Sequence, residues 1–308
     1  MYSFVYKIYF FLRRMQKRLG NGGKFYKLIN FIIGYIEAYY NISVVRQWKK
    51  HPSSKSGINV KERKKKVIVS LTSFPKRIDT LWITIESLLR QTVKPDDVIL
   101  WLAASQFEGI DSLPSTLLKL RERGLTIRFC DDLRSHKKYY YTMLEHPEDI
   151  VILADDDMFY PLDTIEKLLN MHRKYPEDIC SITAEAVKKD APPSEWRNPF
   201  LREKTVHLDL LQAFTGSGSL FPPHSLNEEV FNKDAIKTLC PYADDLWLYY
   251  MANKNDTKVT SLHPWRAFPI TIYNTSDVSL WQMNGLNGQN DVQWNAILKR
   301  YGNSCNKI

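Results

Sequence analysis

Three consecutive carboxylates, Asp155, Asp156 and Asp157, are the residues whose type and spacing point most directly to chemistry. Adjacent carboxylates repel one another, and a divalent cation is the usual means of offsetting such a charge. The preceding residues, 150–154, are uncharged, β-branched or aliphatic, as in a strand buried on both faces. Open α/β sheets bind ligands beyond the carboxyl ends of their strands. The pattern therefore predicts a metal-assisted site for a phosphorylated ligand, with a structural Ca²⁺ site or an acidic surface turn as the alternative.

A second acidic pair, Asp244 and Asp245, begins a segment that we expect to be helical as far as Met251. A carboxylate there could act as a general base. The bland alternative is structural, because acids in the first turn of a helix are favoured by capping and by the macrodipole. The residues alone leave both readings open.

The elements that must position these acids alternate in type along the chain. Hydrophobic patterns predict strands at 67–73, 98–102, 125–130, 150–154, 179–184, 212–223 and 259–269. They predict helices from 79, over 113–123 and 134–145, after Pro161, and over 240–251. This alternation indicates an α/β fold with a mostly parallel, Rossmann-like sheet and helices on both faces. Gly216 and Gly218, within one expected strand, mark a place where backbone could approach a ligand.

The N-terminus differs in composition from the remainder. Residues 1–66 hold 16 Lys and Arg against Glu37 and Glu62, about +14, whereas the whole chain has a net charge of +9 and the remaining 242 residues therefore sum to −5. Residues 1–50 form a basic, aromatic, helical segment, 51–66 a linker, and 67–308 the catalytic domain in our interpretation. The stretch 25–45 contains Lys27 and Glu37 and falls short of a clean membrane span. We expect contact with an anionic membrane surface, or packing on the domain as the alternative.

Two further features bound the setting. Four cysteines stand far apart without a C-x-x-C pair, which is typical of reduced structural thiols and favours a cytoplasmic protein, peripheral on the inner face of the membrane. No nucleic-acid-binding motif accompanies the basic charge, so no nucleic-acid partner is expected.

Several motifs in order resemble a known group. They are Val69-Ser-Leu-Thr-Ser-Phe-Pro-Lys-Arg77, Lys137-Lys-Tyr-Tyr140, Ala154-Asp-Asp-Asp-Met-Phe-Tyr-Pro161, Gly216-Ser-Gly218 and Pro241-Tyr-Ala-Asp-Asp-Leu-Trp-Leu248. Over residues 66–301 the chain resembles bacterial nucleotide-sugar glycosyltransferases of the GT-A fold, close to family 2 and to capsule or cell-surface polysaccharide enzymes. The acidic triplet followed some 90 residues later by Asp-Asp-x-Trp is the more specific part of the likeness.

The resemblance implies a role for each residue. Asp155 and Asp157 would bind Mn²⁺ or Mg²⁺, with Asp155 also placed to meet the ribose, Asp156 supporting them and His263 a third metal ligand. Asp245, or less favourably Asp244, would be the base of an inverting transfer. The implied donor contacts are Thr72, Pro75, Arg77, Asp131, Lys138, Asp155, Asp156, Gly216 and Gly218. The second strand ends Trp101-Leu-Ala-Ala104, without the family's usual acidic pair, so the nucleobase stays open although a UDP-sugar is the expected donor.

Plainer readings compete at several of these positions. Lys138 could be a solvated helix charge, and His263 a structural histidine. Trp247, Trp265 and Trp281 could stack on sugars, although core packing is the interpretation we prefer. Residues 284–291 could form a lid.

The predicted function is metal-dependent transfer of a sugar from a nucleotide sugar to a glycan or lipid-linked acceptor in surface polysaccharide synthesis. The alternatives are a nucleotidyl- or phosphotransferase, for which no Gly-rich P-loop is present, and a non-catalytic glycan-assembly protein.

Overall fold

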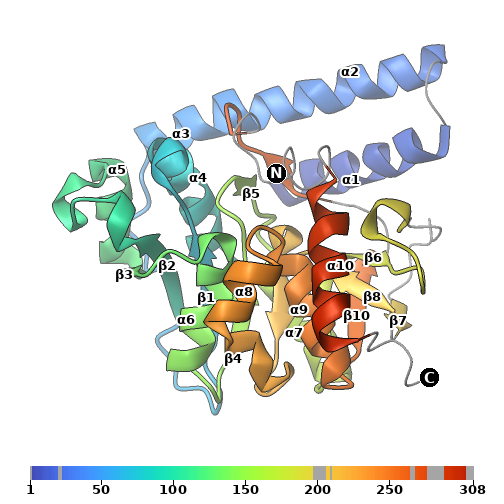
Figure 1. The fold of residues 1–308 in the computed structure, drawn as a ribbon. Helices are drawn as coiled ribbons and strands as arrows, with labels where there is room; N and C mark the ends of the chain where they lie inside the picture. Colours follow the sequence, from blue (N-terminus) through green and yellow to red (C-terminus); the bar gives the residue numbers. More distant parts are fainter. Residues whose placement is uncertain are drawn as a thin grey trace.

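The computed structural model describes residues 2–19, 23–196, 206–208, 210–263, 268–275 and 288–302. Its centre is one large sheet in the order β3-β2-β1-β4-β9-β6-β10-β7, with β8 paired to β6 (Figure 1). The strands are β1 Val67–Thr72, β2 Asp97–Ala103, β3 Leu125–Cys130, β4 Ile150–Leu153, β6 Ile179–Ala186, β7 Val206–Leu208, β8 Leu211–Ala213, β9 Ser219–Phe221 and β10 Val259–His263. β3, β2, β1, β4, β6 and β10 run in one direction, and β7, β8 and β9 run against them. The predicted α/β fold with a mostly parallel sheet is confirmed.

Helices cover both faces of the sheet because its strands bury alternate side chains on opposite sides. Val67, Val69 and Leu71 of β1 join a core with α4 (Ile78–Leu89) and α7 (Thr164–Lys174). Val151 and Leu153 of β4 join another with α6 (Lys137–Glu145), α8 (Lys233–Leu239), α9 (Asp244–Lys254) and α10 (Gln289–Tyr301). These two layers hold the loops at the carboxyl ends of β1 and β4 in place.

The N-terminal segment is a helical hairpin, as predicted, and Figure 1 shows it lying across one side of the domain. It comprises α1 (Tyr2–Leu19), α2 (Lys24–Ala38), a π-helical turn η1 (Tyr39–Val44) and α3 (Val45–Lys50). Its inner side chains share one hydrophobic core with β1, α4 and α7. By length and composition alone the continuous helix from Lys24 to Lys50 could span a membrane, which the sequence reading had not anticipated; 28% of its most apolar window is buried in the protein.

The hairpin also meets a small second sheet, β5 (Met158–Phe159) paired antiparallel with β11 (Ile270–Thr271). Tyr6 Oη donates to the carbonyl of Phe159, and the rings of Tyr40 and Trp48 lie 5.6 and 6.0 Å from the Phe159 ring. The segment after the acidic triplet is therefore held by residues from the far N-terminus.

Two predicted elements differ in the structure. The expected strand 212–223 is broken: β8 and β9 both pair with β6, but the 3₁₀ turn η8 (Thr215–Ser217) separates them. Gly218 has φ +98°, a conformation that other residues rarely adopt, and this ends the turn. The expected helix 113–123 is α-helical only over α5 (Ser115–Leu118) and continues as the 3₁₀ helix η5 (Lys119–Arg123).

The remaining short turns are η2 (Pro75–Arg77), η3 (Ala104–Gln106), η4 (Ile110–Ser112), η6 (Arg134–His136), η7 (Pro193–Glu195) and η9 (Glu228–Phe231). The predicted linker, 51–66, has neither helix nor strand, yet it hydrogen bonds to the domain through Gly57 N–H to Arg123 O and Asn59 N–H to Pro95 O.

Candidate active site

The acidic triplet lies where the sheet changes its direction of growth. From β1 the chain adds β2 and β3 on one side, and then places β4 on the other side of β1. The loops that leave β1 and β4 therefore diverge, and the space between them is the switch point at which open α/β sheets bind ligands. Ser73 to Arg77 follow β1, and Asp155 to Asp157 follow β4.

Arg77 joins these two loops. Its guanidinium pairs with Asp156 and, at 3.0 Å, with Asp157 Oδ2, and it donates to the Thr275 carbonyl at 3.1 Å. Asp156 also accepts from Ser73 Oγ, and its own carbonyl accepts from Thr84 Oγ1 of α4 at 2.9 Å. Asp156 is thus turned inward and braces the loop, which agrees with the supporting role predicted for it.

Lys138, on α6, connects the triplet to the second acidic pair. Its Nζ lies 2.6 Å from Asp155 Oδ1, 2.9 Å from Asp244 Oδ2 and 2.8 Å from Thr215 Oγ1. Only 3% of its side chain is exposed, and its three N–H donors match these three partners. Lys138 is therefore no solvated helix charge; its proposed contact with a diphosphate stays a prediction.

Asp244 and Asp245 stand in the first turn of α9, as predicted, but their surroundings differ. Asp244 is buried and faces the Lys138 ammonium. Asp245 is half-buried, and its Oδ1 accepts from the N–H and the hydroxyl of Thr215 at 3.1 and 2.7 Å. Asp244 has a full counter-charge, whereas Asp245 has neutral donors.

These surroundings separate the two pKa values. Burial alone would raise the pKa of Asp244, but the adjacent Lys138 and then His136 lower it below its ordinary value. Burial and the negative charge of Asp244 raise the pKa of Asp245 to about 7, although Lys138 opposes this. Pairs of acids driven apart in this way identify which member can exchange a proton near neutral pH. Asp245 is that member, which favours it over Asp244 as the base.

Asp157 has a raised pKa as well. Burial, followed by the charges of Asp156 and Asp155, raises it to about 7 in spite of Arg77. The printed contacts join five carboxylates (Asp155, Asp156, Asp157, Asp244 and Asp245) to only two cations, Arg77 and Lys138. The site is therefore short of positive charge.

A divalent ion fits this deficit if it arrives with a phosphorylated ligand. In the described part of the chain, no three His, Cys, Asp or Glu side chains converge on a metal position. Mg²⁺-type ions commonly bind through one or two carboxylates together with substrate phosphates. Asp155, whose side chain is 37% exposed, is the accessible member of the triplet, against 6% for Asp156 and 9% for Asp157.

Gly216 makes room for Asp155. A Cβ added at Gly216 would lie 2.4 Å from Asp155 Oδ2. Tyr160 fixes the same two segments together, because its hydroxyl accepts from Asp155 N–H at 2.8 Å and donates to the Gly216 carbonyl at 3.0 Å. The turn between β8 and β9 is thus fitted to one carboxylate of the triplet.

Gly216→Ala should displace Asp155 without unfolding the protein, because the clash is with the end of a side chain. We expect Mn²⁺-dependent nucleotide binding, measured by calorimetry, to weaken about 10–100-fold, as when the support of a metal ligand is lost. Gly34→Ala is the control, since its Cβ would meet nothing within 4 Å. Equal affinities in the two variants would contradict this role of Gly216.

The other predicted donor contacts lie around this centre. Thr72 Oγ1 donates to the Trp101 carbonyl at 2.7 Å, and Pro75 begins the exposed turn η2. Asp131 follows β3, with its side chain 78% exposed and paired with Lys233 at 3.1 Å. β3 is separated from β1 by β2, so Asp131 is set apart from the acidic centre. The roles predicted for these three residues stay predictions.

His263 and the tryptophans were also considered as site residues. The His263 ring lies 5.8 Å from the Phe10 ring of α1, and burial, Lys167 and Arg14 lower its pKa to about 4. The structure places cations and an aromatic ring around it, and the contacts described above do not include it, so metal ligation stays a prediction. Trp247 is fully buried and donates to the Val230 carbonyl at 3.1 Å, which supports the core interpretation. Trp265, Trp281 and most of the expected lid, 284–287, lie outside the described residues.

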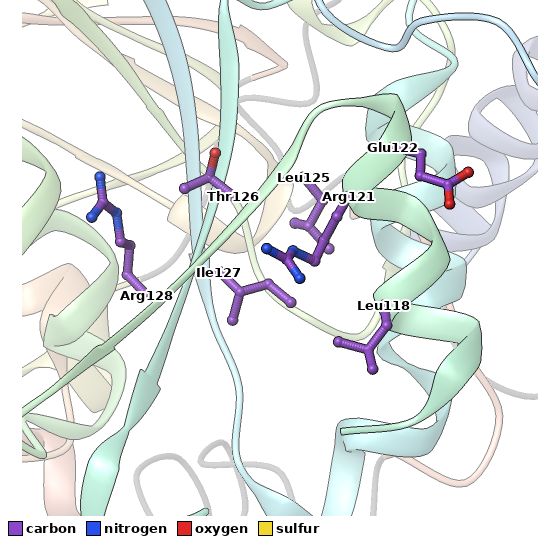
Figure 2. A pocket seen from close by; sticks show the side chains of 7 residues that line it. All are labelled: Leu118, Arg121, Glu122, Leu125, Thr126, Ile127 and Arg128. Atoms are coloured by element: carbon purple, nitrogen blue, oxygen red, sulfur yellow. The ribbon is translucent and has the colours of Figure 1, made fainter. Parts of the chain in front are cut away.

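A surface hollow of about 620 Å³ lies elsewhere, beside the edge strand β3 (Figure 2). It is lined by Leu118, Arg121, Glu122, Leu125, Thr126, Ile127 and Arg128. Because it holds one acid and lies beyond the switch point, we place the active site at the acidic centre.

Sequence reasoning missed Thr215, Tyr160 and Ser73 as site residues. Each stands within or beside a motif already noted: Thr215 precedes Gly216, Tyr160 ends the motif of the triplet, and Ser73 follows Thr72. Their hydroxyls contact Asp245, Asp155 and Asp156 respectively. Only the fold shows which hydroxyl meets which acid.

Comparison with known proteins gives distant likenesses only. No protein-family model matches the sequence, and no curated protein matches it. Among solved structures, the chain is similar to a mannosyltransferase from Pyrobaculum calidifontis in complex with GDP-Man and Mn²⁺, at 15% identity and a TM-score of 0.46, over 86% of this chain and 72% of that one. It is also similar to glucosyl-3-phosphoglycerate synthase from Mycobacterium tuberculosis in complex with Mn²⁺, UDP-glucose and phosphoglyceric acid, at 13% identity and a TM-score of 0.30, over 39% and 44%.

Proposed function

We propose that this protein is a metal-dependent glycosyltransferase that moves a sugar from a nucleoside diphosphate sugar to an acceptor hydroxyl. The observation that carries the proposal is the Lys138 bridge: one buried ammonium contacts Asp155, Asp244 and Thr215, and Thr215 in turn contacts Asp245. This places a cation-binding carboxylate and a proton-accepting carboxylate in one network at the switch point of the sheet. Transfer to a hydroxyl with a diphosphate leaving group needs both functions.

The chain's own residues divide the work. Asp155 and Asp157 would hold Mn²⁺ or Mg²⁺, which supplies Lewis-acid stabilisation of the leaving diphosphate when bound. Asp245 accepts the proton of the acceptor hydroxyl as that oxygen attacks the anomeric carbon, so the product is inverted at this carbon. Thr215 holds the carboxylate of Asp245 through two hydrogen bonds, and Asp244 stays ionised against Lys138. Arg77 holds Asp156 and Asp157 and thereby fixes the loop that bears the metal ligands.

The finer part of the proposal concerns donor and acceptor. A UDP-sugar is the donor we propose, and a glycan or lipid-linked oligosaccharide of a surface polysaccharide is the acceptor. The resemblance of the motifs supports both.

A ligand screen tests the proposal. UDP-, GDP- and dTDP-sugars are compared by thermal shift with and without Mn²⁺, since a ligand that binds only the native state raises its stability by mass action. We expect stabilisation by one donor class that depends on the metal and is lost in Asp157→Ala. Turnover should then release a nucleoside diphosphate.

Other products would identify other functions. Release of pyrophosphate or a nucleoside monophosphate would indicate a nucleotidyl- or phosphotransferase. Failure of every nucleotide sugar to bind the folded protein would leave a glycan-assembly role. Asp157→Ala with unchanged metal-dependent activity would contradict the mechanism.

A further inference from the structure

The N-terminal hairpin exposes a row of large apolar side chains. On α2 these are Phe25, Leu28, Phe31 and Tyr35, each more than half exposed and spaced three or four residues apart, which places them on one face of the helix. Phe4 and Phe11 of α1 are likewise 68% and 59% exposed. We call these six side chains the apolar stripe. Such a contiguous apolar surface is typical of an interaction site.

The opposite faces of the same helices are already occupied. Tyr6 and Tyr9 of α1 and Ile29, Ile33 and Ile36 of α2 are buried in the core shared with the domain. The stripe is therefore the outward side of a hairpin whose inward side is fixed. A helix with one face buried in protein is suited to lie in a membrane surface rather than to cross it.

The hairpin is also strongly basic. Residues 1–50 contain ten Lys and Arg and a single acid, Glu37, so their +9 equals the net charge of the whole chain. Glu37 pairs with Arg13 at 2.9 Å and accepts from the Tyr9 hydroxyl. Exposed cations follow one another at both ends of the α2 stripe, Lys24 and Lys27 before it and Arg46 and Lys49 after it. The partner must therefore be anionic.

The hairpin lies next to the acidic centre. Its inner face contacts β5, which begins one residue after Asp157, and Asn41 Nδ2 donates to the Thr271 carbonyl of β11 at 3.1 Å. Ile272 N–H donates to the Asp157 carbonyl at 2.8 Å. A surface bound by the hairpin would lie on the side of the molecule that holds the active site.

We propose that the hairpin docks the protein onto an anionic lipid bilayer, with the apolar stripe in the boundary between headgroups and acyl chains. Aromatic and aliphatic side chains flanked by cations are what such an interface binds. A nucleic acid would match the cations but would leave the stripe in water. This docking is independent of the proposed sugar transfer, because it is measured without any nucleotide.

Vesicle flotation of the full chain tests the proposal. The protein should float with vesicles of phosphatidylcholine and phosphatidylglycerol in equal parts and stay in solution with phosphatidylcholine alone. Phe31→Glu should weaken binding about tenfold or more, because it replaces an inserted ring with a charge. Lys24→Gln/Lys27→Gln should weaken it by roughly tenfold as well, and added salt should do the same.

Matched controls come from elsewhere on the surface. Val60→Glu changes an 86% exposed apolar residue outside the hairpin, and Lys189→Gln/Lys237→Gln removes two exposed cations. Both should float as the unaltered protein does. Phe11→Glu serves as a second stripe variant if Phe31→Glu does not fold.

Three results would overturn the proposal. The first is equal flotation of the stripe and control variants. The second is a dimer in vesicle-free solution that Phe31→Glu dissociates, which would assign the stripe to a second copy of the chain. The third is binding to an RNA or DNA duplex, without flotation, that the lysine variants abolish.

Discussion

Asp245→Asn is expected to lower sugar transfer about 10²–10⁴-fold, the range attributed to a positioned general base. The amide cannot accept the proton, but its oxygen can still accept the two hydrogen bonds from Thr215, so the geometry should persist. Donor affinity should therefore change little. Initial rates of nucleoside diphosphate release and calorimetric donor binding measure the two effects separately. Transfer within tenfold of the unaltered enzyme would remove Asp245 from the mechanism.

The same variant should be more stable than the natural protein at pH 8. Burial and Asp244 raise the pKa of Asp245 from 3.8 in the unfolded chain to about 7. The native state therefore binds this proton more tightly, and the stabilisation that it gives is complete below about pH 4 and lost as the pH rises through about 7. At pH 8 Asp245→Asn removes a disfavoured charge, and we expect a gain of roughly 1–3 kcal/mol in the free energy of unfolding.

Urea unfolding at pH 8 and at pH 4 tests this gain, which should be present at the first and absent at the second. Asp111→Asn, at an exposed aspartate, is the control and should change stability by no more than about 0.5 kcal/mol. A pH-independent effect of Asp245→Asn would show that packing, and not the buried charge, is responsible.

Local sequence patterns were sufficient for most of the framework. The strand Leu125–Cys130 has the predicted bounds, and β1 and β4 differ from theirs by one residue, because each is a continuous apolar run next to a turn. Asp244 and Asp245 are in the first turn of a helix as predicted. The placement of the acidic loop at the carboxyl end of β4 follows from the same local information.

The contacts among the site residues could not be predicted in this way. Lys138 meets Asp155, 17 residues away, and Thr215, 77 residues away, and these partners depend on how α6 packs on the sheet. A lysine that follows a polar segment reads as a surface residue in the sequence, whereas the structure buries it among acids. The long-range pairing is therefore information of the fold.

The two glycines of the broken strand illustrate a further limit. They were interpreted together as a place where a ligand approaches the backbone. In the structure Gly216 leaves space for Asp155, whereas Gly218 adopts a positive φ and ends the turn. Two different physical requirements give the same sequence signal.

Lys138→Met should have the largest effect on stability of any single change in the network. Methionine fills a similar volume but leaves Asp155 and Asp244 without the ammonium that lies within 2.9 Å of both. Removing one partner of a buried ion pair typically costs about 3–5 kcal/mol, because the remaining charge is uncompensated. Urea unfolding at pH 8 measures this loss. Lys233→Met is the matched control, since its partner Asp131 is largely exposed, and it should cost about 1 kcal/mol or less.

A second substitution distinguishes lost charge from lost packing. Lys138→Met/Asp244→Asn removes the buried carboxylate as well and should recover part of the stability, whereas a packing defect would be additive. The catalytic consequence has a definite sign. Lys138 lowers the pKa of Asp245, so its removal should raise that pKa further, and the acidic limb of the pH–rate profile should move to higher pH. An unchanged limb together with lower stability would limit Lys138 to a structural role and leave Asp245 to be set by Thr215 and Asp244 alone.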